Sequence, residues 1–379
     1  MKRTMIFAIA FSVATIAVTA QVYPVLIPKN AKSMAMGGVF TSIATAEFSF
    51  FGNPAAFAVP KGTLTVVSTD AWAYIKPTIS NIASSIGALQ EANPLPALAR
   101  RMPGNGGLGG GASASFGYAG NGLGLGAFAT TDNFGAGYSI PGAVLTSDTE
   151  VGAVIGLGLP FQIFGSTLNI GGDIRPFYRA RTQKPIAIMS SLTSGGDILD
   201  QMTVDAGFGL AMDLGASLQL GSFGFGFAVR DIAPSFPVWT GSFNQLITSL
   251  KKGTLPSTTD AKAKAVFLPS VTAGMSWNPR LWPGFVDPAL YLEFQDPVAM
   301  VSNWDGFGSA LNLLHAGVEV RLLSFLMLRG GINRGWLSAG GGVRFAFFDM
   351  NAAVFTEELG ALPGDRPRSG LSVQAAVRF

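Results

Sequence analysis

Cysteine is absent from this chain of 379 residues, which excludes disulfide bonds and thiolate metal sites. Charge is scarce as well, because 12% of the residues are charged, against about 25% in an ordinary soluble domain. The net charge of +3 is scattered, without the basic cluster that nucleic-acid binding requires. Beyond residue 20, no run reaches the roughly 18 uncharged apolar residues of a membrane helix. The chain therefore has too little charge for a large water-exposed surface.

Both ends of the chain carry informative patterns. Lys2 and Arg3 precede an apolar stretch that ends in small residues before Gln21, so residues 1–20 are predicted to be an export signal. In the last ten residues, apolar side chains alternate with polar or small ones, and the chain ends on Phe379, which is typical of a transmembrane β-strand. An exported, apolar chain without a membrane helix can satisfy its backbone in a bilayer as a closed barrel.

Period-2 segments recur through residues 61–379 and predict an all-β, 14-stranded antiparallel transmembrane barrel. Long and short connections alternate between these segments, as expected for outer loops and periplasmic turns. The predicted strands are 63–74, 107–119, 122–131, 150–161, 166–181, 203–220, 223–231, 267–278, 288–295, 311–322, 325–333, 337–347, 350–357 and 370–379.

The same alternation sorts the charged residues. The parity that turns Val204 and Phe208 toward lipid leaves Asp205 and Asp213 inside. A charge facing lipid at the bilayer midplane costs about 2–4 kcal/mol, so this sorting is required of a barrel. Two interpretations stay open: the inward charges pair with one another, or they form a track that steers an anionic head group. The predicted track is Asp173, Arg175, Arg179, Glu319, Arg321 and Arg329.

Residues 21–60 do not alternate like the strands. A small, apolar run contains Met36-Gly37-Gly38, and Asn53-Pro54-Ala55 follows Phe51. This segment resembles the N-terminal hatch of the FadL-type long-chain fatty acid transporters, including their PorV-like branch, in which a Met-Gly-Gly stretch and an Asn-Pro-Ala motif lie in a plug inside a fourteen-stranded barrel. The closing portion, with Leu328 to Asn333, is also similar to the PorV-like branch. The resemblance implies that Met36, Gly37, Gly38, Phe51, Asn53, Pro54 and Ala55 take part in gating.

A hatch is also expected on physical grounds. A barrel of fourteen strands leaves an aqueous pore unless something fills it. The alternative, a disordered periplasmic arm, would leave Phe48, Phe50, Phe51 and Phe57 in water.

Two loop segments have apolar helical spacing, which is unusual for porin loops. They predict either a surface groove that collects an apolar molecule, with two lysines available to a carboxylate, or a lid formed by helices packed on each other. The predicted ligand-binding residues are Ile82, Ile86, Leu89, Trp239, Phe243, Leu246, Ile247, Lys251 and Lys252.

No motif indicates an enzyme, a cofactor or a metal, because His315 is the only histidine and has inward parity. The resemblance implies a monomeric channel in the outer membrane of a Gram-negative-type bacterium, surrounded by its lipid, for passive uptake of long-chain fatty acids or other hydrophobic small molecules. Two alternatives stay open: a non-transporting scaffold or shuttle for secreted proteins, as in the PorV-like branch, and a general porin.

Overall fold

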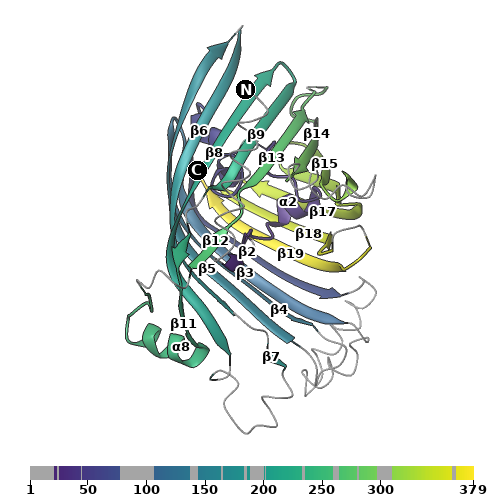
Figure 1. Cartoon of the computed structure of the whole chain (residues 1–379). Helices are drawn as coiled ribbons and strands as arrows, with labels where there is room; N and C mark the ends of the chain where they lie inside the picture. Colours follow the sequence, from purple (N-terminus) through teal and green to yellow (C-terminus); the bar gives the residue numbers. More distant parts are fainter. Residues whose placement is uncertain are drawn as a thin grey trace, which may run out of the picture.

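Fourteen antiparallel strands close into a barrel in the computed structural model of the chain (Figure 1). The structure describes residues 21–23, 25–43, 45–76, 106–136, 144–163, 165–182, 186–187, 200, 202–232, 235–258, 264–279, 281–296, 310–360 and 364–379. The predicted export signal and the predicted loop helix with Ile82, Ile86 and Leu89 lie outside these residues. Among the described residues, no helix is both long and apolar enough to span a bilayer.

All fourteen predicted strands are confirmed. In chain order they are β2 (Thr63–Lys76), β3 (Gly107–Gly120), β4 (Leu123–Ala136), β5 (Val144–Ile163), β6 (Ser166–Thr182), β8 (Thr203–Leu220), β9 (Phe223–Ile232), β13 (Ser270–Trp277), β14 (Val286–Gln295), β15 (Leu314–Leu322), β16 (Leu326–Asn333), β17 (Trp336–Phe345), β18 (Phe348–Glu358) and β19 (Pro367–Arg378). Neighbours in sequence pair with one another, and the β19–β2 pairing closes the ring.

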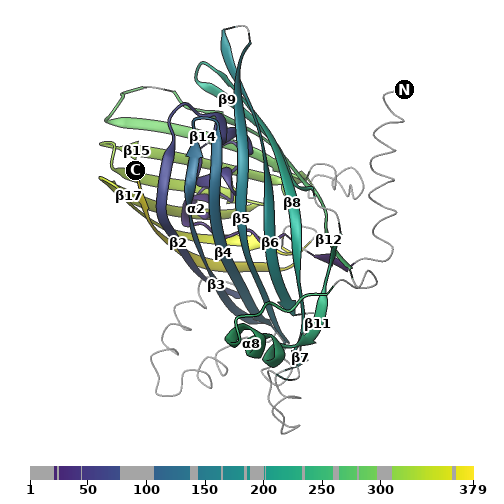
Figure 2. The ribbon, with the colours of Figure 1, turned by 90° about the vertical axis from the view of Figure 1, so that its left-hand side faces the viewer.

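The two ends of the barrel differ. Tight hairpins such as Asn121-Gly122, where both residues have positive φ (52° and 88°), lie at one end, which we call the turn end. The C-terminus is also there, since Phe379 exchanges backbone hydrogen bonds with Leu64. The opposite end, the loop end, carries α8 (Phe243–Lys251). The predicted alternation of long and short connections fails once, because the two-residue hairpin Arg334-Gly335 joins β16 and β17 at this end. The wall is uneven, with the long strands β5, β6 and β8 standing opposite the short strands β14, β15 and β17 (Figure 2).

The outward and inward faces follow the predicted parity. In β19, Leu371, Val373 and Ala375 are exposed on the outside, while Ser372 and Gln374 are buried inside. Inward charges are buried as expected, including Asp205 and Asp213, each 1% exposed. The apolar side chains thus form the outer surface of the wall, and the ionic ones line its interior.

Five short strands were not predicted. β1 (Gln21–Tyr23), β12 (Lys264–Phe267) and β10 (Phe236–Pro237) form a small separate sheet, while β7 (Ile186–Ala187) and β11 (Trp239–Ser242) extend the main one. The predicted strand 267–278 begins at Ser270 instead, because Phe267 belongs to β12. Pro269, which cannot donate to a ladder, separates the two strands.

The N-terminal segment, residues 25–60 as described, packs against the inward face of the wall. It contains α2 (Ala31–Ala35), α3 (Ala46–Ser49) and the short 3₁₀ helix η1 (Pro54–Ala58). α2 contacts β16, β17, β18 and β19, whereas η1 contacts β3, β4, β5, β6 and β8. The segment therefore touches both sides of the ring.

Candidate functional site

A buried carboxylate on the wall holds the N-terminal segment. Glu293 of β14 is fully buried and accepts hydrogen bonds from the backbone amides of Phe40 (3.1 Å) and Ser42 (2.5 Å) and from the Ser42 hydroxyl (2.8 Å). The alternation of the predicted strand 288–295 leaves Glu293 on the inward face, but it does not indicate this role. Only the inward parity of Glu293 could be read from the sequence. The backbone that it binds lies about 250 residues away, so no local pattern indicates the contact.

The predicted gating residues Met36, Gly37 and Gly38 lie against β15 and β16. Gly37 donates to the Ser338 hydroxyl (3.0 Å) and accepts from Nδ1 of His315 (2.7 Å). Both glycines have positive φ, and a Cβ at Gly37 would lie 2.4 Å from the carbonyl oxygen of Ile332. The Met-Gly-Gly stretch thus needs glycine for its backbone conformation and for close approach to the wall.

Asn53, Pro54 and Ala55 form the start of η1. The Asn53 side-chain oxygen caps the helix by accepting from the Ala55 amide (3.0 Å), and its amide nitrogen donates to the Ala216 carbonyl of β8 (3.0 Å). Pro54 lies in the first turn of η1, where a backbone N–H would have no partner within the helix, so the missing N–H costs no hydrogen bond. The neighbouring Phe51 carbonyl accepts from the Arg230 guanidinium. The predicted motif is therefore the start of a turn that is tied to β8 through Asn53 and to β9 through Phe51.

Inward glycines on the wall make room for η1. A Cβ at Gly171 of β6 would lie 2.1 Å from the Pro54 carbonyl oxygen, and one at Gly215 of β8 would lie 2.0 Å from Asn53 Oδ1. Because real Cβ atoms do not approach so closely, any side chain at these positions would displace η1. Part of the high glycine content therefore serves contact between the wall and the N-terminal segment.

The predicted charged residues Asp173, Arg175 and Arg179 lie together in one cluster of β5, β6, β8 and β9. Arg179 pairs with Asp148 (2.5 Å) and Glu150 (3.4 Å), while Arg175 pairs with Asp213 (3.6 Å) and with Asp231. Neither carboxylate oxygen of Asp173 has a hydrogen-bond partner among the described residues. The cluster, which also includes Arg181 and Arg230, has five carboxylates for four guanidinium groups.

The other three predicted charged residues lie in a different part of the wall, near the turn end. Glu319 of β15 pairs with Arg329 (2.7 Å) and with Arg321 (3.4 Å). The six residues of the predicted track thus form two separate ion-paired groups, one on β6 and the other on β15 and β16.

An aromatic cluster lies inside the wall at β1. The Tyr23 hydroxyl donates to Asp205 (2.7 Å), and its ring lies under the Arg181 guanidinium (5.1 Å to the ring centroid). Burial, together with the bond to Asp205, raises the pKa of Tyr23, so the phenol stays neutral and can donate. Phe177, Phe236 and Phe267 also belong to this cluster, which fastens the beginning of the described chain to the interior.

The predicted helix at the loop end is present as α8, which begins with a capping box between Ser242 and Gln245. The apolar face of α8 faces the wall of the barrel. Phe243, Leu246 and Ile247 line a cavity of about 210 Å³ together with wall residues of β5, β6 and β8. The lining is mostly apolar and includes Val151, Tyr178, Ala180, Val204, Leu250 and Leu255. Three of the predicted ligand-binding residues therefore share one apolar pocket.

The other predicted ligand-binding residues that the structure describes are Trp239, Lys251 and Lys252. Lys251 and Lys252 are exposed at the end of α8, and Trp239 lies on β11, where it pairs with Ala206. Val204 and Val151 have outward parity, so α8 packs on the outside of the wall. The pocket therefore lies on the outer side of the wall, at its loop end.

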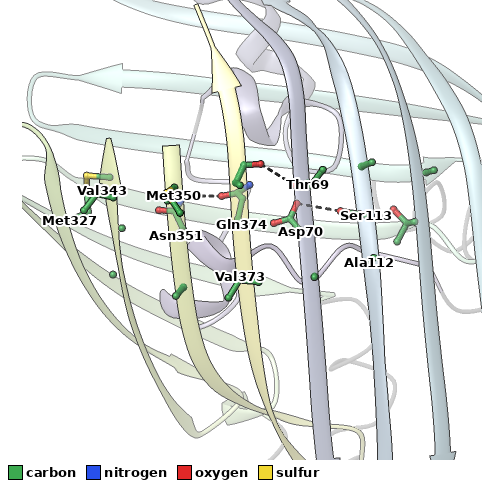
Figure 3. Close-up of a pocket in the computed structure, with 18 of the residues that line it drawn as sticks. Thr69, Asp70, Ala112, Ser113, Met327, Val343, Met350, Asn351, Val373 and Gln374 are labelled. Atoms are coloured by element: carbon green, nitrogen blue, oxygen red, sulfur yellow. Dashed lines mark hydrogen bonds between the residues drawn. The ribbon is translucent and has the colours of Figure 1, made fainter. Parts of the chain in front are cut away.

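A second apolar hollow, which the sequence did not predict, crosses the outside of the wall (Figure 3). This outward groove has a volume of about 940 Å³ and spans strands from β16 to β5. Its floor follows one line of cross-strand partners, from Leu326 through Val343, Met350, Ala375, Thr69 and Ala114 to Ala129. The signal for it was a set of small residues, mostly alanine and glycine, at outward positions of neighbouring strands.

The sequence matches no protein-family model and no curated protein sequence. Solved structures of hydrocarbon channels are similar to the chain. The toluene transporter TodX of Pseudomonas putida is 14% identical, with 95% of this chain and 99% of that chain covered and a TM-score of 0.48.

Two further similar structures are a FadL homologue of Pseudomonas aeruginosa and the monoaromatic hydrocarbon channel CymD. The first is 12% identical, covering 93% of this chain and 99% of that chain with a TM-score of 0.45. The second is 11% identical, covering 92% and 96% with a TM-score of 0.47.

Proposed function

We propose that this protein is an outer-membrane channel of a Gram-negative-type bacterium for passive uptake of hydrophobic small molecules, with long-chain fatty acids as the first candidates. The observation that carries the proposal is the apolar pocket under α8. It lies at the loop end, it is bounded by an amphipathic helix and the outward wall, and two lysines lie at the end of that helix. Such a site suits an apolar tail with an acidic head group.

We also propose that residues 21–60 act as a hatch. Their contacts with both sides of the wall and their hydrogen bonds to Glu293, Ser338 and His315 support this role. A segment held by a few buried side chains can be released by rearranging those contacts, as passage of a molecule requires. The same contacts speak against a general porin, which needs an open lumen.

Leu246→Asp tests the pocket, because it places a charge in the buried centre of the apolar face of α8. Introducing an unpaired charge there costs at least about 1–3 kcal/mol, so the Kd for a fluorescent long-chain fatty acid should rise roughly 10- to 100-fold. Deleting Phe243 to Lys252 should weaken binding at least as much. Both measurements use detergent-purified protein titrated with the fatty acid.

Thr248→Asp provides the matched control. It adds the same charge on the exposed side of the same helix, so binding should stay at the wild-type level. Equal affinity in wild type, Leu246→Asp and the deletion would show that the pocket is not the binding site. A wild-type protein that binds no fatty acid or other apolar molecule would contradict the proposed function itself.

A further inference from the structure

The pocket under α8 and the outward groove meet at strand β5, because Thr149 lines both of them. On β6 the cross-strand partner of Thr149 is Ala180, which lines the pocket. On β4 its partner is Thr131, which lines the groove. All three positions have outward parity. The two hollows therefore adjoin on the outer surface of the wall.

The pocket under α8 is small for the ligand proposed above. Its volume is about 210 Å³, whereas pockets for small molecules usually measure about 300–1,000 Å³. A long acyl chain that begins under α8 must therefore end outside the pocket. The outward groove, with about 940 Å³, is the apolar hollow that adjoins it.

The groove is long enough for the rest of such a chain. Its floor crosses β4, β3, β2, β19, β18, β17 and β16 in turn. Because paired strands lie about 4.8 Å apart, the six steps between these strands span roughly 29 Å. An extended acyl chain that crosses one leaflet covers half of a hydrocarbon core about 30 Å thick. The groove therefore exceeds the length of one such chain.

The groove exists because the outward side chains are small in this part of the wall. The lining positions of β2, β3 and β4 include Ala71, Ala112 and Ala129. Outward positions of β5 and β8 instead carry large side chains, such as Ile155 and Phe208. A chain lying across β2 to β4 can thus approach the backbone of the wall more closely than it can on β5 or β8.

The hydroxyl groups of the lining have partners within the wall. The Thr69 hydroxyl donates to the Ala375 carbonyl (3.3 Å), and the hydroxyls of Thr131 and Thr149 bond to each other (2.9 Å). A hydroxyl without a partner would be costly to cover with hydrocarbon. These pairings therefore leave a lining that an acyl chain can cover without that cost.

The inner face of the wall beneath the groove is bridged by hydrogen bonds between neighbouring strands (Figure 3). Asn351 of β18 donates to Gln374 of β19 (2.8 Å), and Ser113 of β3 donates to Asp70 of β2 (3.2 Å). These bonds hold the strands together on the lumen side. The groove is therefore a feature of the lipid-facing side of a joined wall.

We propose that the pocket under α8 and the outward groove form one extended acyl-chain site. The head group and the first part of the chain lie under α8, and the tail lies in the groove. This inference rests on the proposed function, since it concerns the same ligand. A tail held in the groove lies on the lipid side of the wall, which gives the ligand a way into the bilayer that does not pass the N-terminal segment.

The test is the dependence of affinity on chain length. The full-length mature protein in detergent is titrated calorimetrically with octanoate, dodecanoate and hexadecanoate, and the Kd of each variant is divided by that of wild type. This ratio cancels the partition of each fatty acid into detergent.

Ala129→Phe fills the groove next to Thr131, on the outward face of β4. Its Kd ratio should stay near one for octanoate, which fits under α8, and should rise at least about tenfold for hexadecanoate. Burial of each methylene group changes the Kd about fourfold, so excluding two of them is enough. Ala114→Phe blocks the groove one strand further from the pocket, so its ratio should begin to rise at a longer chain.

Ala273→Phe is the matched control. Ala273 has outward parity on β13, which lies outside the strands that the groove crosses, so its ratio should stay near one at every chain length. Ratios that rise with chain length in the two groove variants but not in Ala273→Phe support the extended site.

A ratio near one at every length in both groove variants would contradict the extended site, and so would an equal rise at all lengths or an earlier onset in Ala114→Phe than in Ala129→Phe. In these cases the proposed function still stands if wild type binds the fatty acids and Leu246→Asp does not. A wild-type protein that binds none of the three fatty acids would overturn both.

Discussion

Replacing Glu293 with alanine should turn a barrel of low conductance into one that passes ionic current in planar bilayers. The change leaves the backbone amides of Phe40 and Ser42 and the Ser42 hydroxyl buried without their acceptor. A buried donor that loses its acceptor costs about 1–3 kcal/mol, so the docked state of the N-terminal segment should lose several kcal/mol. Single-channel recording and limited proteolysis of residues 25–60 measure the effect.

Glu293→Gln separates the charge from the shape of this side chain. It keeps one carbonyl oxygen as an acceptor, so both the conductance and the rate of cleavage should lie between those of wild type and Glu293→Ala. An alanine variant with wild-type conductance and protease resistance would show that Glu293 does not hold the segment in place.

Gly171→Ala should loosen η1 and destabilise the docked N-terminal segment by about 1–3 kcal/mol or more. The new methyl group would lie 2.1 Å from the Pro54 carbonyl oxygen, and a backbone atom cannot yield as a flexible side chain can. Faster proteolysis between Asn53 and Val59 and a lower melting temperature are the expected readouts.

Gly172→Ala is the matched control on the same strand. Its methyl group would point outward and lie 3.0 Å from the end of the Leu214 side chain, which can move. This variant should keep wild-type protease resistance. If both variants behaved alike, close packing of η1 on β6 would not explain the glycine at position 171.

The wall of the barrel could be predicted from sequence because its rule is local. A strand of alternating residues such as 371–378 carries its own parity, and each of the fourteen predicted strands is present. Their bounds are less well predicted, because β5 begins at Val144 and not at residue 150. The helix α8 could be predicted for the same reason, since its apolar spacing and its Ser242–Gln245 capping box lie within one short stretch of sequence.

What the helix and the N-terminal segment pack against could not be predicted, because those partners are far away in sequence. Nothing near α8 indicates that Val204 and Ala180 of the outward wall lie beneath it. The Lys29 ammonium, for example, pairs with Glu357, which lies 328 residues further along the chain. Inward parity alone also does not distinguish Glu293, which binds backbone amides, from Glu319, which pairs with arginines. The strands β1 and β10, of three and two residues, are too short to show any period.

The pairing of β19 with β2 has a consequence for how the molecule is assembled. These strands hold residues 63–76 and 367–378, so the ring stays open until the end of the chain has been added to it. The contacts of α2 with β16, β17, β18 and β19 need these last strands to be in place, whereas η1 can already pack on β5, β6 and β8. Maturation should therefore proceed with the amino-terminal residues held against a half-built sheet, and the final seam should enclose them, which makes late zippering the slow step of biogenesis.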